Sequence, residues 1–220
     1  MTTIWLTRHA ETALPTVFHG AESDVGLSDL GRRQAGAAAG WFVGRGVTAV
    51  VSSGMLRARD TAAPVAAACG GPHLIEPDLH ERRVGGLSGT PFSSVGGPWP
   101  DTIDRWEAGD TAFATPGAES FDDLRRRLLP AFERVAERHA GGRVVVVAHG
   151  VVCKVLLLCL LPGYGPAAWK RLGRVPNLAV SELTRTAAGG WAAAELLQVP
   201  PPVAALSDGA PTGVGEKSQG

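Results

Sequence analysis

Residues 143–161 have the sequence RVVVVAHGVVCKVLLLCLL, and this stretch decides the fold. The four consecutive valines at 144–147 are typical of a strand that is buried on both faces. His149 and Gly150 interrupt the apolar run, and a second apolar segment of helical length follows to Leu161. We therefore expect a buried strand, a turn and a buried helix here, rather than a helix that spans a membrane.

The same order of apolar strand and helix recurs along the chain. The predicted strands are 4–6, 49–51, 74–75, 143–148, 179–183 and 191–197. The predicted helices are 29–42, 55–69, one that starts at Ser120, and one that follows His149-Gly150 and ends at Leu161. Pro64 and Pro130 lie inside two of these helices; we expect a break or kink at Pro64 and a bend at Pro130. Alternating strands and helices predict an α/β fold, a three-layer α/β/α sandwich around a mostly parallel central sheet.

Two segments lack periodic apolar positions. Residues 79–117 are rich in Gly, Pro and Ser, so we expect mostly loop there, with one helical turn at 103–106. Trp99 and Trp106 in this segment are candidates for a substrate pocket or for the core. From Pro200 onward the composition changes to Pro, Ala, Gly and Ser. The sequence therefore predicts one domain at 1–199 and a disordered tail at 200–220 that packs little on the core.

Composition limits the classes of partner. Lys plus Arg and Asp plus Glu both number 21, so the net charge is zero and predicts neither a nucleic-acid partner nor a membrane partner. The three cysteines show no zinc-binding spacing, and no signal peptide is visible, so we expect a cytoplasmic protein with reduced thiols. The sequence leaves the oligomeric state open, with a homodimer among the alternatives.

Polar residues follow the ends of three predicted strands. His9 comes after the first strand, Ser53 after the second and His149 after the valine strand. Ligands bind at the carboxyl ends of the strands in open parallel sheets. We therefore expect these three segments to converge on one cleft.

The residue types around those strand ends suit phosphoryl chemistry. Arg8 and Arg57 provide guanidinium groups that bind phosphate oxygens in a bidentate fork. Imidazole, as in His9 and His149, is a competent nucleophile at neutral pH, and the carboxyl group of Glu81 can act as acid and base in turn. The cations lie without clustered carboxylates, so we expect no metal and no cofactor.

Seven segments, in order, resemble the motifs of the histidine phosphatase superfamily, the phosphoglycerate mutase-like group. They are RHAET at 8–12, LSDLGRRQA at 27–35, SSGMLRARDTA at 52–62, LHERRVGGLSG at 79–89, PGAES at 116–120, HG at 149–150 and PN at 176–177. The resemblance covers roughly residues 3–197. It implies the phosphoglycerate mutase-like fold and a metal-independent phosphomonoester hydrolase that acts on a small phosphorylated metabolite.

The resemblance also implies a role for each matching residue. His9 attacks phosphorus and becomes phosphohistidine. Arg8, Arg57 and His149 bind the phosphoryl oxygens and stabilise their charge. Glu81 protonates the leaving oxygen and then helps to activate water. Thr12 and Gly150 belong to the same motifs as His9 and His149, and we expect them to bind the substrate together with Arg8, Arg57 and His149.

Three positions depart from the family pattern. Ala10 replaces the usual glycine, and we expect little loss from one methyl group. Pro15 stands where many members have a phosphate-binding asparagine, and Ala21 stands where an arginine often follows the glycine. These changes leave the substrate unassigned.

Two other functions compete with hydrolysis. A cofactor-dependent phosphoglycerate mutase is the first, because residues 79–89 resemble the mutase motif, but only residues 90–115 separate that motif from 116–120, where mutases carry a longer insertion. A non-catalytic phosphate-binding module is the second, although the catalytic set is complete. Glu119 is interpreted as a helix-start carboxylate and residues 125–127 as a solvated helix face.

Overall fold

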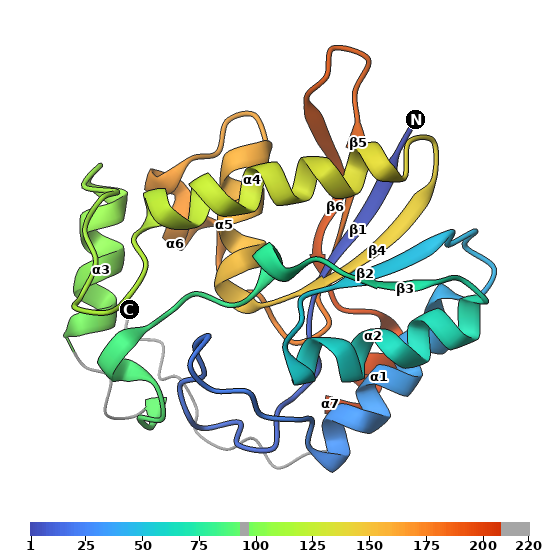
Figure 1. Cartoon of the computed structure of the whole chain (residues 1–220), viewed down its shortest axis with the longest axis horizontal. Helices are drawn as coiled ribbons and strands as arrows, with labels where there is room; N and C mark the ends of the chain where they lie inside the picture. The colour runs from blue at the N-terminus through green and yellow to red at the C-terminus, as the bar shows by residue number, and fades with distance from the viewer. Residues whose placement is uncertain (93–96, 208–220) are drawn as a thin grey trace.

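A six-stranded sheet forms the centre of the computed structural model, which describes residues 1–92 and 97–207. Its order is β3-β2-β4-β1-β5-β6 (Figure 1). The strands are β1 (Thr3–Arg8), β2 (Ala49–Ser52), β3 (His73–Ile75), β4 (Arg143–Ala148), β5 (Val180–Arg185) and β6 (Trp191–Gln198). The first four strands in the sheet order are parallel and the last two are antiparallel. The mostly parallel sheet is confirmed.

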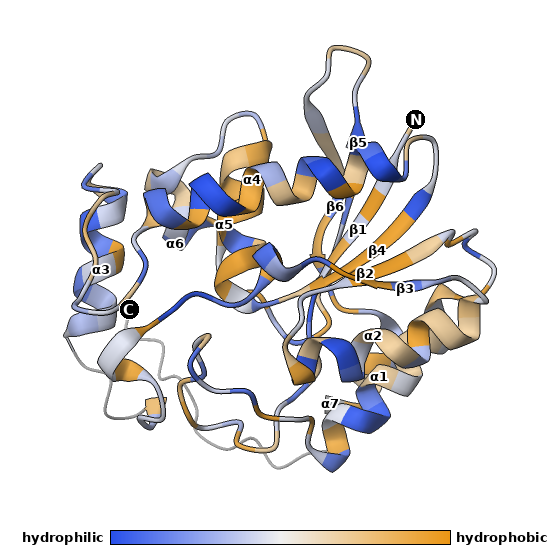
Figure 2. Ribbon diagram, viewed as in Figure 1, coloured by the Kyte–Doolittle hydropathy of each residue, from blue (hydrophilic) through white to orange (hydrophobic). Residues whose placement is uncertain are grey.

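Helices cover both faces of this sheet. They are α1 (Asp29–Phe42), α2 (Leu56–Cys69), α3 (Pro98–Glu107), α4 (Phe121–Arg138), α5 (Gly150–Leu160), α6 (Trp169–Leu172) and α7 (Pro201–Ser207). Side chains alternate between the faces along each strand. Ile4 and Val144 pack with α4 and α5, whereas Trp5 and Val145 pack with α1 and α2. Apolar residues fill both interfaces (Figure 2), and the three-layer sandwich is confirmed.

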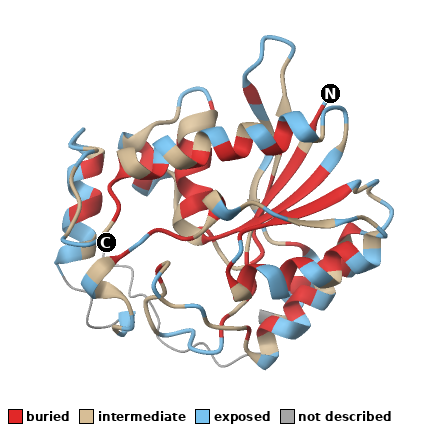
Figure 3. Cartoon of the chain, in the orientation of Figure 1, coloured by how far each residue is buried: buried red, intermediate tan, exposed pale blue. Residues whose placement is uncertain are grey.

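The valine stretch forms the middle of the molecule, as predicted. β4 lies between β2 and β1, and its residues from Val144 to Ala148 are at most 1% exposed. The strands and the inner faces of the helices are buried together (Figure 3). Within the described ranges, no helix has the length and apolar character needed to cross a membrane.

The two prolines inside helices do not interrupt them. α2 continues through Pro64 and α4 continues through Pro130. A proline removes the hydrogen bond to the carbonyl four residues earlier. Those carbonyls belong to Asp60 and Arg126, which are exposed residues, so water can replace the missing donor. Of the two alternatives at Pro64, a break or a kink, the structure excludes the break.

The segment at 79–117 is more helical than predicted. A single turn was expected at 103–106, but α3 extends over Pro98–Glu107. Its prolines occupy the first turn, where a helix needs no N–H donor, so a composition typical of loops is compatible with a helix start. Trp106 is fully buried and its indole nitrogen donates to the carbonyl of Phe113 at 2.9 Å, which makes it a core residue. Residues 93–96 lie outside the described part.

The segment after Pro200 also differs from the expectation. Residues Pro201–Ser207 form α7, which packs on α1. Val203 is 1% exposed and lies in an apolar cluster with Ala35 and Ala38. One apolar side chain at the right place is enough to dock a short helix, and a search for periodicity overlooks it. Residues 208–220 of the predicted tail lie outside the described part.

Removing α7 is expected to lower the melting temperature. A chain that ends at Pro200 loses the buried side chain of Val203, whose burial contributes about 2 kcal/mol. For a domain of this size that loss corresponds to a decrease of about 4–8 °C. The control is a chain that ends at Ser207, because both chains lack 208–220. Equal melting temperatures in a thermal scan would contradict the docking of α7.

Candidate functional site

His9 and His149 follow neighbouring parallel strands. β1 and β4 pair in a register that places Arg8 opposite Ala148, so the next residue of each strand emerges at the same edge. The amide of His9 donates to the carbonyl of Ala148 at 2.9 Å. The two imidazole rings lie with their centroids 5.3 Å apart, and both residues are buried. The predicted convergence of the two histidines is therefore seen in the structure.

The hydrogen bonds of His9 define which ring nitrogen is free. Its Nδ1 lies 2.7 Å from the carbonyl oxygen of Ala10. A carbonyl only accepts, so Nδ1 carries the proton and Nε2 holds the lone pair. Burial, and then the charges of Arg8 and Arg57, hold the pKa of His9 well below its ordinary value. The ring is thus neutral at neutral pH, as a nucleophile must be.

Asn177 fixes the backbone at this point, which explains the PN motif. Its side-chain amide donates to the carbonyl of His9 at 2.9 Å, and the amide of Leu178 donates to the carbonyl of Arg8 at 3.0 Å. Leu178 has a φ of +55°, an uncommon value for a residue with a side chain. The turn before β5 therefore holds the end of β1.

Ser53 orients His149. Its hydroxyl lies 2.7 Å from Nε2 of His149 and accepts from the amide of Met55 at 3.3 Å. When the hydroxyl donates to Nε2, the imidazole proton lies on Nδ1, which is buried and has no hydrogen-bond partner among the described residues. Burial and the charge of Arg57 hold the pKa of His149 well below its ordinary value. Ser53 followed a predicted strand but was not among the predicted site residues.

Arg8, which is partly buried, and Arg57, which is buried, bring two guanidinium groups to the histidines. Arg8 donates through Nη1 to the carbonyl of Val175 at 2.9 Å, and Arg57 donates through Nη1 to the carbonyl of Ser23 at 2.8 Å. Within the described part, the Nε atom of each is buried without a partner. Burial lowers the pKa of Arg8 to about 10, so the group stays charged. Two cations therefore face the site with unused donors.

Glu81 reaches the same place from the loop after β3. Its side chain accepts from the amide of Arg82 at 2.8 Å and, through the other oxygen, from the amide of Val151 at 3.4 Å. Val151 lies in the first turn of α5, where backbone amides favour negative charge. Glu81 is 7% exposed, and its charge interacts with Arg8 and Arg57. The five residues predicted for catalysis thus lie together at one edge of the sheet.

The two additional binding residues occupy different positions. Gly150 begins α5, and a Cβ atom there would lie 3.5 Å from Nε of Arg8, so Gly150 borders the site. Thr12 is buried and forms an isolated antiparallel bridge with Leu27. Thr12 therefore joins the loop after His9 to the segment before α1, and its role in binding stays a prediction.

The LSDLGRRQA motif holds the loop after His9. The hydroxyl of Ser28 donates to the carboxylate of Glu11 at 2.7 Å, and the side chain of Gln34 accepts from the amide of Glu11 at 3.0 Å. A Cβ atom on Gly31 would lie 2.0 Å from the carbonyl oxygen of Glu11, so only glycine fits there. The motif therefore acts through Glu11, whose carboxylate is engaged in this contact.

Arg127 is not part of a solvated face, contrary to the prediction. Its guanidinium forms an ion pair with Glu119 at 2.7 Å, and its side chain is 14% exposed. Glu119 is buried and accepts from the amide of Arg83 at 2.8 Å. Sequence reasoning missed this pair, because the two residues are distant from Glu81 in the chain and only folding brings them to its loop.

The three departures from the motif pattern lie in different surroundings. Ala10 is fully buried in an apolar cluster with Leu27 and Ala35, so its methyl group is accommodated. Pro15 is exposed. Ala21 lines a pocket beside Glu81 together with four other residues, Glu22, Met55, His80 and Arg83. Among the described residues, no group of three or more His, Cys, Asp or Glu side chains is placed to hold a metal ion.

The chain matches one family model and resembles two proteins named as phosphatases. The model of the histidine phosphatase superfamily (branch 1) matches residues 4–197. A metal-independent phosphoserine phosphatase of Arabidopsis thaliana is 38% identical over 165 residues, which cover 72% of this chain and 68% of that protein. The native structure of a mycobacterial glucosyl-3-phosphoglycerate phosphatase is 29% identical with a TM-score of 0.78, covering 90% of this chain and 99% of the other.

Two further relatives are a probable mutase and a bifunctional protein. A probable phosphoglycerate mutase of Yersinia pestis is 31% identical over 196 residues, which cover 87% of this chain and 90% of that protein. A bifunctional protein of Mycobacterium tuberculosis is 38% identical over 167 residues, which cover 74% of this chain and 46% of that protein. The chain thus spans about half the length of the first curated relatives it matches.

Proposed function

The chain belongs to the histidine phosphatase superfamily, branch 1, and from this premise we propose that it hydrolyses the phosphomonoester of a small metabolite through a phosphohistidine at His9. One observation carries the proposal. Three buried nitrogen atoms, Nε of Arg8, Nε of Arg57 and Nδ1 of His149, have no partner among the described residues. Buried donors are normally satisfied, so their convergence beside His9 favours a phosphoryl group as their partner.

The proposed first step transfers the phosphoryl group to the enzyme. Nε2 of His9 attacks phosphorus, a P–N bond forms and the ester P–O bond breaks. Glu81 must enter this step protonated; it gives its proton to the leaving oxygen, which departs as an alcohol, and regains one in the second step. Arg8, Arg57 and His149 stabilise the charge that develops on the other oxygens. Thr12 and the N-terminus of α5 at Gly150 complete the proposed binding set.

The proposed second step returns the enzyme to its starting state. Water attacks the phosphorus of phosphohistidine while Glu81 takes up one of its protons. The P–N bond breaks, its electron pair returns to Nε2 of His9, and inorganic phosphate leaves. The two guanidinium groups supply the positive charge in both steps, so the proposed chemistry needs no metal or cofactor.

The pocket beside Glu81 supports a leaving group that carries a carboxylate. Arg83 and His80 present basic groups there. The carboxylate of Glu22, on the same wall, already accepts from the amides of Val84 and Gly85 at 2.9 Å. The relatives named as phosphatases of phosphoserine and glucosyl-3-phosphoglycerate act on esters of this kind. Phosphoserine and 3-phosphoglycerate are therefore the first substrates to assay.

Phosphoglycerate mutase activity is the second candidate, because one relative is a probable mutase. A mutase must keep its phosphoenzyme from water, and extra closing segments serve that purpose. Here only residues 90–115 separate the two motifs, and this short segment favours hydrolysis. An assay with 3-phosphoglycerate that measures both inorganic phosphate and 2-phosphoglycerate distinguishes the two activities.

Activity is expected to survive the removal of metal ions. The screen uses phosphoserine, 3-phosphoglycerate, glycerol phosphate and nitrophenyl phosphate, each with and without excess EDTA. Because Arg8 and Arg57 provide the charge, rates should be equal in the two conditions. A complete loss that a divalent ion restores would show that the proposed mechanism is wrong.

The remaining proposals concern the surroundings of the protein. We propose a cytoplasmic location and no nucleic-acid or membrane partner, on the basis of the zero net charge and the reduced-thiol composition. The oligomeric state stays open, with a homodimer among the alternatives, and sedimentation of the purified chain measures it. The catalytic domain is proposed to occupy residues 1–199, with α7 docked on it.

A further inference from the structure

Glu119 and Arg127 form a partly buried ion pair at the start of α4, which we call the Glu119–Arg127 clamp. Glu119 immediately precedes Ser120, the N-cap of the helix, and Arg127 lies two turns further along it. The capping box of Ser120 and Asp123 fixes the first turn, because both of its hydrogen bonds are present. Arg127 therefore lies within α4, whereas Glu119 lies just outside it, one residue before the N-cap.

Arg127 uses its guanidinium to hold the loop that carries Glu81. Its Nη1 donates to the carbonyl of Asp78 at 2.6 Å, and its Nη2 donates to the carbonyl of Glu81 at 3.3 Å. Its Nε and Nη2 also donate to the two carboxylate oxygens of Glu119 at 2.7 and 2.9 Å. A planar fork with five donors suits this combination, and a lysine could not reproduce it.

Glu119 holds the other side of the same loop. Its carboxylate accepts from the amide of Arg83, and its own amide donates to the carbonyl of Arg83 at 2.9 Å. The carbonyl of Glu119 accepts from Nε of Arg82 at 2.7 Å. The clamp thus contacts three successive residues, beginning with Glu81.

One hydrogen bond, from the amide of Arg82, links these contacts to the carboxyl group of Glu81. The amide of Arg82 donates to that carboxylate at 2.8 Å and so sets its orientation. The guanidinium of Arg82 lies 5.2 Å from the centre of the Trp106 ring, which further immobilises the residue. Loss of the clamp would free the peptide that aims Glu81, without removing any group that touches the substrate.

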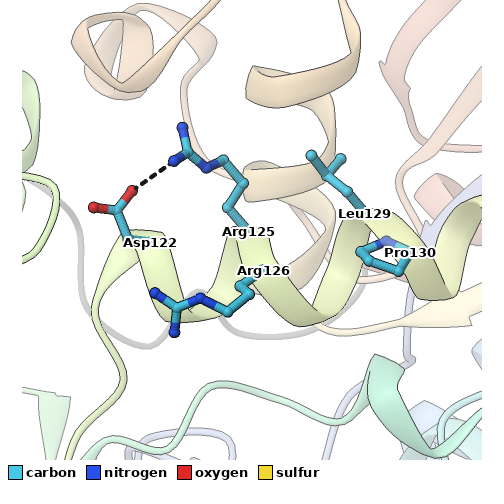
Figure 4. Close-up of a pocket in the computed structure, with 5 residues that line it drawn as sticks. All are labelled: Asp122, Arg125, Arg126, Leu129 and Pro130. Carbon is cyan, nitrogen blue, oxygen red and sulfur yellow. Dashed lines mark ion pairs between the residues drawn. The ribbon is translucent and has the colours of Figure 1, made fainter.

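The clamp differs from two other ion pairs of the same helix. Arg125 and Arg126 pair with Asp122 and Asp123, but their side chains are 55% and 76% exposed. Figure 4 shows the two arginines extending from α4 in different directions, with Arg125 directed to Asp122. By contrast, the side chains of Arg127 and Glu119 are 14% and 4% exposed.

Both burial and Arg127 act on the charge of Glu119. Burial opposes the charge of Glu119, but the hydrogen bond and charge of Arg127 outweigh it and lower the pKa of Glu119. Such an ion pair contributes little net stability compared with apolar side chains of similar size, although removing one member leaves the other charge unpaired and is destabilising. What the pair does contribute is a fixed geometry for residues 81–83.

We propose that Glu119 and Arg127 are positioning residues for catalysis, which aim the carboxyl group of Glu81 at the leaving oxygen of the substrate. This inference rests on the proposed function, in which Glu81 is the general acid. The residues that orient the general acid then lie at the start of α4, outside the phosphate site.

The test compares two leaving groups in the full chain. Arg127→Gln, Arg127→Lys and Glu119→Gln are assayed with glycerol phosphate, whose alkoxide needs protonation, and with nitrophenyl phosphate, whose phenolate does not. A misplaced acid should lower kcat for glycerol phosphate by roughly tenfold to a hundredfold. The first chemical step with nitrophenyl phosphate should change little. Arg126→Gln is the matched control and should leave both rates unchanged.

Three outcomes would overturn the inference. Equal losses with both substrates would indicate a general structural defect, and unchanged rates would show that the clamp is dispensable. If Arg127→Gln does not fold, as judged by circular dichroism, the comparison rests on Arg127→Lys and Glu119→Gln. A Glu81→Gln variant is assayed in parallel. If it too lacks the leaving-group dependence, the general-acid assignment fails first, and the role of the clamp fails with it.

Discussion

Replacing His9 with alanine is expected to abolish turnover. The structure leaves Nε2 of His9 as the unprotonated nitrogen of a neutral ring on which the charges of Arg8 and Arg57 act, and no phosphoenzyme can form without it. Loss of a nucleophile costs on the order of 10⁴- to 10⁶-fold in kcat. Hydrolysis of the best substrate from the screen measures the loss. Labelling with ³²P-substrate, quenched in alkali because phosphohistidine is unstable in acid, should show no labelled protein.

Two controls separate loss of the nucleophile from loss of the fold. His139→Ala changes a histidine at the C-terminal end of α4 and should retain activity. The His9→Ala protein should still bind inorganic phosphate in a calorimetric titration, because Arg8, Arg57 and His149 remain. Substantial activity of His9→Ala, or ³²P-labelling of it, would contradict the role of His9.

Replacing Glu81 with glutamine is expected to give a loss that depends on the leaving group. Glutamine keeps the size of the side chain but cannot give up a proton. An alkyl phosphate should therefore lose roughly a hundredfold to ten-thousandfold in rate. Nitrophenolate is a weakly basic leaving group, so the phosphorylation of His9 by nitrophenyl phosphate should continue. Dephosphorylation then becomes slow, and phosphohistidine should accumulate.

Rapid-quench labelling with both substrates measures this effect. The control is Glu137→Gln, an exposed carboxylate on α4, which should behave like the unchanged protein. Equal losses on both substrates, with no labelled enzyme, would contradict the assignment of Glu81 as the acid. The nearby Glu11 would be a weak replacement, because its carboxylate already accepts from Ser28.

Much of the fold was predictable because strong local patterns coincide with it. The run at 144–147 forms a strand only when it is covered on both faces, and this requires the helices that the rest of the sequence supplies. The polar residues that follow each strand then meet at one edge, since parallel strands end on the same side. The sequence therefore indicates His9, His149 and the other predicted site residues.

Local patterns failed where one contact decides the structure. α3 begins with a composition typical of loops, and α7 docks through Val203 within a segment that resembles a tail. A proline tolerated at a helix start and a single buried valine leave almost no periodic signal. The same limit applies to Pro64, whose effect depends on whether the orphaned carbonyl faces water.

The sequence by itself determined the layers of the sandwich, the order of the motifs and the types of residue that lie at the strand ends. Only the tertiary structure decided how those residues are held. It showed which nitrogen of His9 is free and that Ser53 orients His149. It also showed that Arg127 donates hydrogen bonds to Glu119 and to the carbonyl of Glu81. The physical reason is range: periodicity and propensity act over a few residues, whereas a hydrogen bond between residues 46 positions apart forms only after the chain has folded.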